Sequence, residues 1–107
     1  FWEGISIDDA LINLRKMHAI TKQAANGKPV IITETGWPSK GEAVLDAAPS
    51  EINAMRYFIN TQNWAQTEGV AIFHFSSFDE SWKVAIEGEV GARWGIWDKD
   101  ETLKYEK

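Results

Sequence analysis

The stretch VIITETGWPSKG, from Val30 to Gly41, decides the fold, because an apolar run ends there on a carboxylate. Residues 30–33 predict a buried strand of the kind that parallel sheets cover on both faces. Glu34 follows at once, and a glycine, a tryptophan and a proline come directly after Thr35. A strand that only had to stop could end in a simple Asn-Gly turn. The sequence therefore indicates a strand end that presents an acid beside an aromatic side chain.

The predicted strand, which starts at about Pro29, lies between two stretches with helical periodicity. Apolar residues recur at helical spacing from about Ile7 to Asn26, after Ser6, a favourable N-cap, and before Gly27. A second helix is predicted from about residue 50 to Gly69, after a loop rich in glycine, proline and serine. Both helices are long enough to cover a sheet.

A second apolar run, VAIFHF over residues 70–75, predicts another strand. The order helix, strand, helix, strand is typical of parallel α/β folds. We expect residues 1–4 to be the tail of an earlier strand, which would make the sheet three-stranded. Residues 76–107 lack clear periodicity and predict a long loop with a small hairpin, and a loop of this length is usually functional.

Composition places the chain among ordinary globular domains. Its 107 residues are 44% hydrophobic and 25% charged, which suits one domain over residues 1–107. A net charge of −5, from 16 acidic and 11 basic residues, disfavours nucleic-acid or anionic-membrane partners. No apolar run approaches the roughly 20 residues that cross a bilayer. With no cysteine, and with His18 and His74 far apart, we expect no disulfide, metal site or cofactor.

Acidic and aromatic residues gather after the two predicted strands. The carboxyl ends of neighbouring parallel strands lie at the same edge of a sheet, where ligand sites form. Glu34 follows the first strand, and Asp79 and Glu80 come shortly after the second. Four tryptophans lie within reach of that edge: Trp37, Trp82, Trp94 and Trp97. Carboxylates can act on a glycosidic bond, and flat rings can stack on pyranose faces, so the pattern favours a sugar site.

Five motifs follow one another along nearly the whole chain: FWEGISIDDA, ITETGWPS, FDESWK, GEVGARWGIWD and LKY. Together, and in this order, they resemble glycoside hydrolase family 17, the β-1,3-glucan-active enzymes, in its fungal and bacterial branches. The resemblance implies a (β/α)₈ barrel whose enzymes retain anomeric configuration by means of two glutamates. A β-glucan is then the expected partner.

The resemblance also implies roles for individual residues. Glu34 would be the nucleophile, at the end of the seventh strand, and Trp37 would belong to the sugar-binding wall. The charged residues Glu80, Lys83 and Glu89 match a cluster that lies near the catalytic acids in the family. Trp82 is a further candidate for the sugar platform.

The length of the chain limits what the resemblance implies. A full barrel takes about 250 residues, so 107 residues correspond to its last third, from the end of strand six through strand eight. The family's general acid lies at the end of strand four, and no segment of this sequence corresponds to it. A retaining glycosidase needs carboxyl groups about 5–5.5 Å apart. Activity is thus expected to depend on an N-terminal barrel piece or on association through open sheet edges, which invite pairing.

Each candidate also has a simpler interpretation. Glu34 could be a solvated strand-end acid, and the three charged residues of the cluster could form a surface ion-pair network. Trp37 and Trp82 could pack the long loop. Three functions therefore stay open: a β-1,3-glucan hydrolase or transglycosylase, an inactive β-glucan-binding module, or a structural fragment that self-associates. The resemblance favours an extracellular, cell-wall or periplasmic location.

Overall fold

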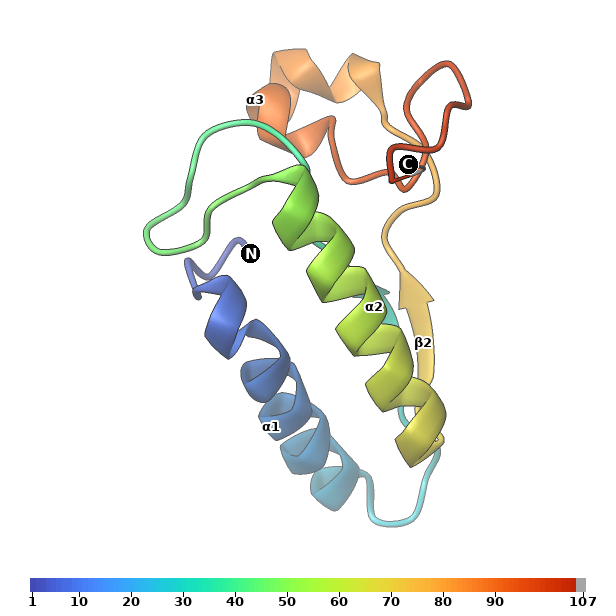
Figure 1. Ribbon diagram of the computed structural model, residues 1–107. Helices are drawn as coiled ribbons and strands as arrows, with labels where there is room; N and C mark the ends of the chain where they lie inside the picture. The colour runs from blue at the N-terminus through green and yellow to red at the C-terminus, as the bar shows by residue number, and fades with distance from the viewer. Residues whose placement is uncertain (106–107) are drawn as a thin grey trace.

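The computed structural model describes residues 1–105 and shows helices packed beside a small sheet (Figure 1). In chain order the elements are α1 (Ile7–Ala25), β1 (Ile31–Thr35), α2 (Glu51–Glu68), β2 (Ala71–His74), the 3₁₀ turn η1 (Ser81–Lys83) and α3 (Val84–Gly91). The last two residues of the expected final loop, 106 and 107, lie outside this description.

The two strands pair in parallel, so the predicted α/β arrangement is confirmed. Ile31 lies opposite Ala71, and the register is irregular toward the end of β1. The expectation of a third strand at the start of the chain is wrong. There the chain turns, and the backbone N–H of Gly4 donates to the carbonyl of Phe1 at 2.8 Å. Residues 1–105 therefore hold a two-stranded sheet.

The long helices begin and end on the signals that their sequence carries. The hydroxyl of Ser6 accepts from the N–H of Asp9 at 3.3 Å, and that of Ser50 accepts from Asn53 at 3.0 Å. Each bond satisfies a backbone donor that the first turn of a helix leaves free. Gly69 ends α2 in the left-handed conformation. Within residues 1–105, each helix is too short or too polar to span a lipid bilayer.

The sheet has one covered face and one bare face. The helix α2 lies across β2 (Figure 1), and the ring of Phe58 meets the His74 ring edge-on at 4.8 Å. On the other face, Ile31 is 52% exposed and Phe73 is 64% exposed. Burying a large apolar side chain stabilises a fold by about 1.5–3 kcal/mol. The exposed side chains of this face are therefore of the kind that a protein core normally covers.

The best-buried core lies where the loop after β1 meets the two long helices. Its buried members are Ala10, Trp37, Ala47, Ala54 and Tyr57, with Phe1, Ile7 and Tyr105 packed against them. The cluster joins α1, α2 and the loop between β1 and α2. The packing of this cluster therefore holds the carboxyl end of β1 in place.

The expected long loop after β2 is partly helical, which corrects the sequence prediction. Residues 84–91 form α3, and Gly88 interrupts it with a φ of 74°. Three glycines in and near this segment hide its periodicity, whereas burial of Val90 and Gly91 stabilises it in the fold. The expected small hairpin is limited to one antiparallel bridge, between Trp97 and Leu103.

Candidate active site

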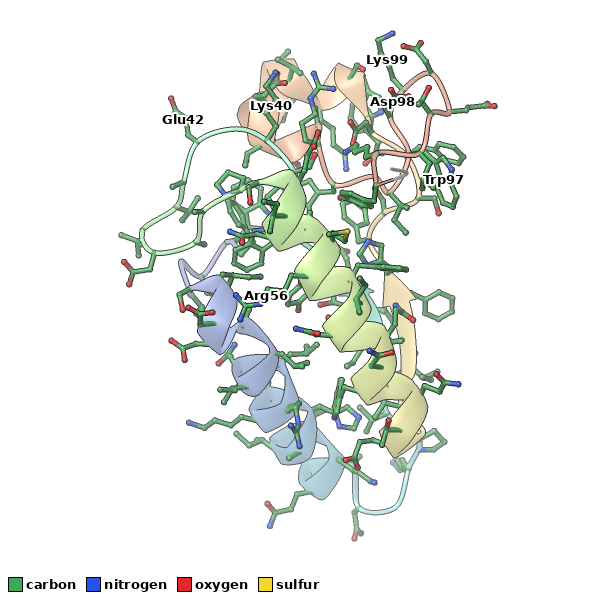
Figure 2. The ribbon with its side chains drawn as sticks, in the orientation of Figure 1. Lys40, Glu42, Arg56, Trp97, Asp98 and Lys99 are labelled. Atoms are coloured by element: carbon green, nitrogen blue, oxygen red, sulfur yellow. The ribbon has the colours of Figure 1, made fainter. Side chains whose placement is uncertain are left out.

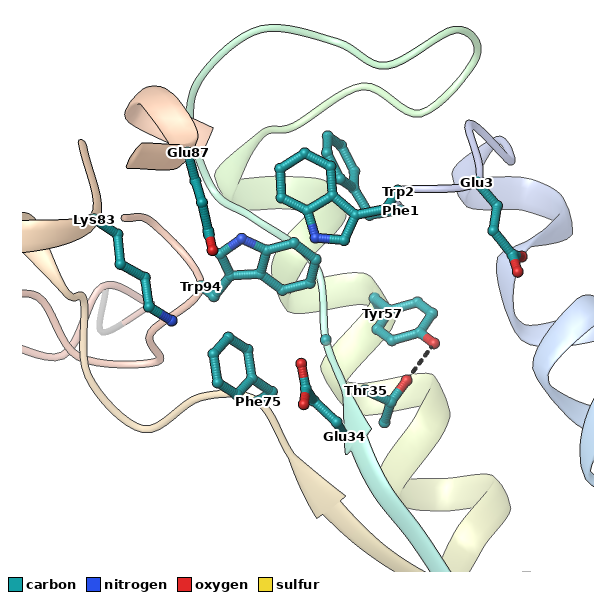
Figure 3. A pocket seen from close by; sticks show the side chains of 11 residues that line it. Phe1, Trp2, Glu3, Glu34, Thr35, Tyr57, Phe75, Lys83, Glu87 and Trp94 are labelled. Atoms are coloured by element: carbon teal, nitrogen blue, oxygen red, sulfur yellow. Dashed lines mark hydrogen bonds between the residues drawn. The ribbon is translucent and has the colours of Figure 1, made fainter. Parts of the chain in front are cut away.

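A cleft of about 300 Å³ opens at the carboxyl end of the two strands (Figure 3). Its lining comes from both strand ends, from the start of the chain and from the segment around α3. The lining residues are Phe1, Trp2, Glu3, Glu34, Thr35, Gly36, Tyr57, Phe75, Lys83, Glu87 and Trp94. This cleft therefore lies at the edge of the sheet where the sequence predicted a ligand site.

The end of β1 directs two neighbouring side chains to opposite sides. The hydroxyl of Thr35 shares a hydrogen bond of 2.7 Å with the hydroxyl of Tyr57 on α2. Because successive side chains of a strand alternate, Glu34 points the other way. Its carboxylate is exposed and lies near Phe75 and Trp94 in the cleft (Figure 3).

Gly36 explains why a glycine follows this strand. A Cβ atom at this position would collide with the carbonyl oxygen of Phe75 and lie 3.2 Å from Cε3 of Trp94. Only a residue without a side chain lets the end of β1 approach the segment after β2 so closely. The glycine therefore brings Glu34 and the aromatic residues into one cleft.

Aromatic rings form one wall of the cleft. The indoles of Trp2 and Trp94 stack with centroids 5.9 Å apart and an interplanar angle of 29°. Phe1 and Phe75 meet Trp94 edge-on at 5.7 and 5.9 Å. Trp2 is 53% exposed and Trp94 only 8%, so Trp2 offers the more accessible face and Trp94 the fixed one.

Trp37 does not belong to this wall. It is 2% exposed, its indole N–H donates to the carbonyl of Ala48 at 3.0 Å, and its ring lies 5.7 Å from that of Tyr57. A side chain packed in the core offers no face to a sugar, so the expected place of Trp37 in a sugar-binding wall is not what the structure shows. The packed Trp37 side chain instead stabilises the loop that follows β1.

The structure brings together only two members of the predicted charged cluster. Nζ of Lys83 lies 2.6 Å from the carboxylate of Glu80 and 4.6 Å from the ring centroid of Phe75. Lys83 therefore places a positive charge at the cleft. Trp82 is 65% exposed, and the Lys83 ammonium lies 5.3 Å from its ring, but Trp82 does not line the cleft.

Glu89 lies apart, in an ion-pair group at the surface. Its carboxylate accepts from Nε of Arg93 at 2.7 Å and lies 3.8 Å from Nζ of Lys40, which projects beside α3 (Figure 2). The hydrogen bond from Arg93 lowers the pKa of Glu89 below its usual value. For this residue the surface-network interpretation describes the observed contacts.

Glu87 is one of several cleft residues that the sequence analysis did not single out. It lies on α3, one helical turn after Lys83, and its side chain extends toward Trp94 (Figure 3). Had residues 84–91 been recognised as helical, the spacing of four from Lys83 would have placed both on one side. The glycines around Glu87 removed that signal.

The remaining sequence candidates lie outside the cleft. Trp97 projects outward (Figure 2), with its ring tilted over Phe78 at 5.7 Å. His74 packs under α2, and His18 meets Trp64 edge-on at 5.6 Å. In the part of the chain that the structure describes, no three His, Cys, Asp or Glu side chains are close enough to hold a metal ion.

The chain is similar in sequence to known proteins over most of its length. Residues 1–95 match the family model described as the BtgE/BtgC glycoside hydrolase domain. A glucan 1,3-beta-glucosidase of Candida albicans is 36% identical over 90 residues, which cover 79% of this chain and 29% of that protein. A probable family 17 glucosidase of Saccharomyces cerevisiae is 31% identical over 87 residues, covering 81% of this chain and 22% of that protein.

Solved structures give the same result. The glycoside hydrolase family 17 β-1,3-glucanosyltransferase of Rhizomucor miehei superposes with a TM-score of 0.91 at 32% identity. An active-site mutant of a Rhizomucor miehei β-1,3-glucanosyltransferase, in complex with laminaritriose, superposes with the same score at 31% identity. Both alignments cover 98% of this chain and 38% of the enzyme. The chain spans less than two fifths of the length of the relatives it matches.

Proposed function

The chain belongs to the BtgE/BtgC glycoside hydrolase domain family, within glycoside hydrolase family 17, and we propose that it carries the nucleophile side of a β-1,3-glucan active site. The proposed substrate follows from the relatives, one named a glucan 1,3-beta-glucosidase and another bound to laminaritriose. We further propose that the chain is the C-terminal part of a (β/α)₈ barrel, with β1 and β2 as strands seven and eight. An extracellular or cell-wall location would suit such a substrate.

The position of Glu34 carries this proposal. Its carboxylate ends a parallel strand, is exposed, and shares a cleft with an aromatic wall and an ammonium group. The ring of Trp94 supplies an apolar surface for a pyranose, and Lys83 supplies positive charge. Glu3 and Glu87 add further carboxylates to the lining, and these can accept hydrogen bonds from sugar hydroxyls.

The proposed reaction proceeds with retention in two steps. In the first, a carboxylate oxygen of Glu34 attacks the anomeric carbon, the glycosidic C–O bond breaks, and the leaving oxygen takes a proton from a second carboxyl group. In the second, water or a sugar hydroxyl gives its proton to that group and displaces Glu34 from the anomeric carbon. Water gives hydrolysis, and a sugar hydroxyl gives transfer.

The second carboxyl group, which protonates the leaving oxygen, is not one of the residues that line the observed cleft in this proposal. Glu80, an acid of the predicted charged cluster, pairs with Lys83 and does not line the cleft. We propose that the group comes from polypeptide that covers the bare face of the sheet, either an N-terminal barrel piece or another copy. The exposure of Ile31 and Phe73 supports such a cover.

A glycosyl fluoride tests the nucleophile separately from the acid. Fluoride leaves without protonation, so 2-deoxy-2-fluoro-β-laminaribiosyl fluoride requires a nucleophile and no general acid. We expect one equivalent of sugar to become attached to Glu34, detected by intact-mass and peptide mass spectrometry. The Glu34→Gln variant should remain unlabelled.

A matched control is Glu68→Gln, which removes a carboxylate at the far end of α2 and should label at the wild-type rate. Labelling of Glu34→Gln at that rate would reject the nucleophilic role. Absence of labelling in the wild type, with intact binding of laminaritriose, would favour an inactive β-glucan-binding module.

The bare face of the sheet also favours self-association as an additional property. Two apolar side chains, Ile31 and Phe73, stand exposed beside open strand edges, which pair readily with other chains. Sedimentation equilibrium of the wild type and of a Phe73→Lys variant tests this. We expect a concentration-dependent dimer that the variant loses, and a wild-type monomer at high concentration would contradict it.

A further inference from the structure

The carboxylate of Asp79 is buried behind the aromatic wall and does not line the cleft. Its side chain is 1% exposed. It accepts a hydrogen bond from the backbone N–H of Gly95 at 3.0 Å, and it lies 3.4 Å from a guanidinium nitrogen of Arg93. Since Trp94 stands between these two residues, Asp79 holds the chain on both sides of the wall indole.

Lys104 supplies the main counter-charge and extends the network to a third segment. Its ammonium is 2.5 Å from Asp79 and donates to the hydroxyl of Ser39 at 2.9 Å. The N–H of Ser39 in turn donates to the carbonyl of Arg93 at 2.8 Å. Burial lowers the pKa of Lys104, and the hydrogen bond with Asp79 opposes that shift. The network thus ties together the loop after β1, the segment after β2 and the end of the described chain.

These bonds hold the backbone on either side of Trp94, whose indole belongs to the aromatic wall. The carbonyl of Trp94 accepts from the N–H of Ser76 at 3.0 Å, and its indole packs against the glycine that follows β1. The indole has no polar partner among these contacts. Its orientation therefore depends on where residues 93–95 are held.

We propose that Asp79 and Lys104 are positioning residues, which fix residues 93–95 and thereby orient the Trp94 indole in the cleft. The pair touches no part of the cleft surface, so it acts through Trp94. Its relevance to sugar binding rests on the proposed function, whereas its effect on the indole does not. A buried charge that loses its partner is strongly unfavourable, so removal of either charge should displace this segment.

The test follows the six tryptophan indole N–H signals of the ¹⁵N-labelled chain by NMR. Trp94→Phe and Trp64→Phe variants assign the wall signal and a reference signal on α2. In Asp79→Asn we expect the Trp94 signal to shift and broaden while the Trp64 signal stays in place. Asp8→Asn is the matched control, because it removes a charge from an exposed ion pair with Arg56, and it should move neither signal.

A Trp94 signal that keeps its wild-type position in Asp79→Asn would overturn the proposal. If that variant does not fold, Lys104→Gln decides in the same way, since it leaves Asp79 its bonds to Arg93 and Gly95. Laminaritriose titration then separates the two proposals. We expect about tenfold weaker binding in the variant whose indole moves. A wild type that binds no sugar would contradict the proposed function, and an indole that moves would still support the positioning role.

Discussion

Glu34, near the carboxyl end of β1, and Asp79, in the segment after β2, are both acids, and the structure gives them opposite surroundings. Glu34 is exposed in the cleft. Asp79 is buried and bonded to an ammonium, a guanidinium and a backbone N–H. Hydrogen bonds and cations stabilise a carboxylate in its charged form and occupy its oxygens. An acid near the end of a strand therefore stays accessible or becomes part of a structural network, depending on the donors around it.

Replacing each acid with an uncharged residue should show a large loss of stability for Asp79 and almost none for Glu34. Asp79→Ala leaves Lys104 buried without its partner and should lower the free energy of unfolding by about 3–5 kcal/mol. Glu34→Gln should change that free energy by less than about 0.5 kcal/mol. Urea unfolding followed by circular dichroism measures both values. A Glu34 variant that loses as much stability as the Asp79 variant would remove the distinction between the two acids.

Trp37 and Trp82, which the sequence assigned to one sugar platform, differ in the same way. Trp37 is 2% exposed and Trp82 is 65% exposed. Trp37→Ala leaves a core cavity and should cost about 3–5 kcal/mol in unfolding free energy. Trp82→Ala should cost less than about 0.5 kcal/mol. Equal losses in urea unfolding would show that Trp82 is packed more firmly than its exposure indicates.

Local signals in the sequence predicted the frame of the fold. Ser6, Ser50 and Gly69 are caps whose effect is confined to one helical turn, so the ends of α1 and α2 followed from their positions. The parallel pairing of β1 and β2 followed from the order of elements. The caps depend only on neighbours in sequence. The pairing joins residues far apart in the chain, but the order of the elements limits how it can form.

The details of the candidate site depend on contacts between distant segments. Trp37 is buried because Ala48, farther along the same loop, and Tyr57 on α2 contact it. The sequence could not distinguish that burial from exposure on a rim. Likewise, α3 is stabilised by packing of Val90 and Gly91, although its glycines disfavour a helix. These outcomes required the tertiary structure.

His74, on the face of the sheet that α2 covers, should make the stability of the protein depend on pH. Burial under α2 lowers the pKa of His74 to about 4, below the value of about 6.5 for an unfolded chain. Between these values the unfolded chain binds a proton that the folded chain does not. Stability should therefore fall as the pH falls from 6.5 to 4, by about 2 kcal/mol once partial exposure is considered.

The matched control is His74→Phe, which cannot titrate and keeps an aromatic ring against Phe58. Within residues 1–105, Nδ1 of His74 has no hydrogen-bond partner to lose. Carboxyl groups with a lowered pKa, such as Asp98, also make the folded protein less stable in acid. The relevant quantity is therefore the difference in unfolding free energy between wild type and variant at each pH. Parallel pH dependence of urea midpoints in both proteins would contradict a buried neutral histidine.

A smaller loss of stability than for Asp79, Trp37 or His74 is expected at the hydrogen bond that supports the end of β1 beside Glu34. Tyr57→Phe removes a partly buried hydroxyl that shares a 2.7 Å hydrogen bond with Thr35, the neighbour of Glu34 on β1. We expect a loss of about 1 kcal/mol in unfolding free energy, as for a typical buried hydrogen bond. Thr35→Val removes the other partner, and the double variant should lose less than the sum of the two single losses. Additive losses would mean that the two hydroxyls act independently, and the end of β1 would then be held by the close approach at Gly36 rather than by this bond.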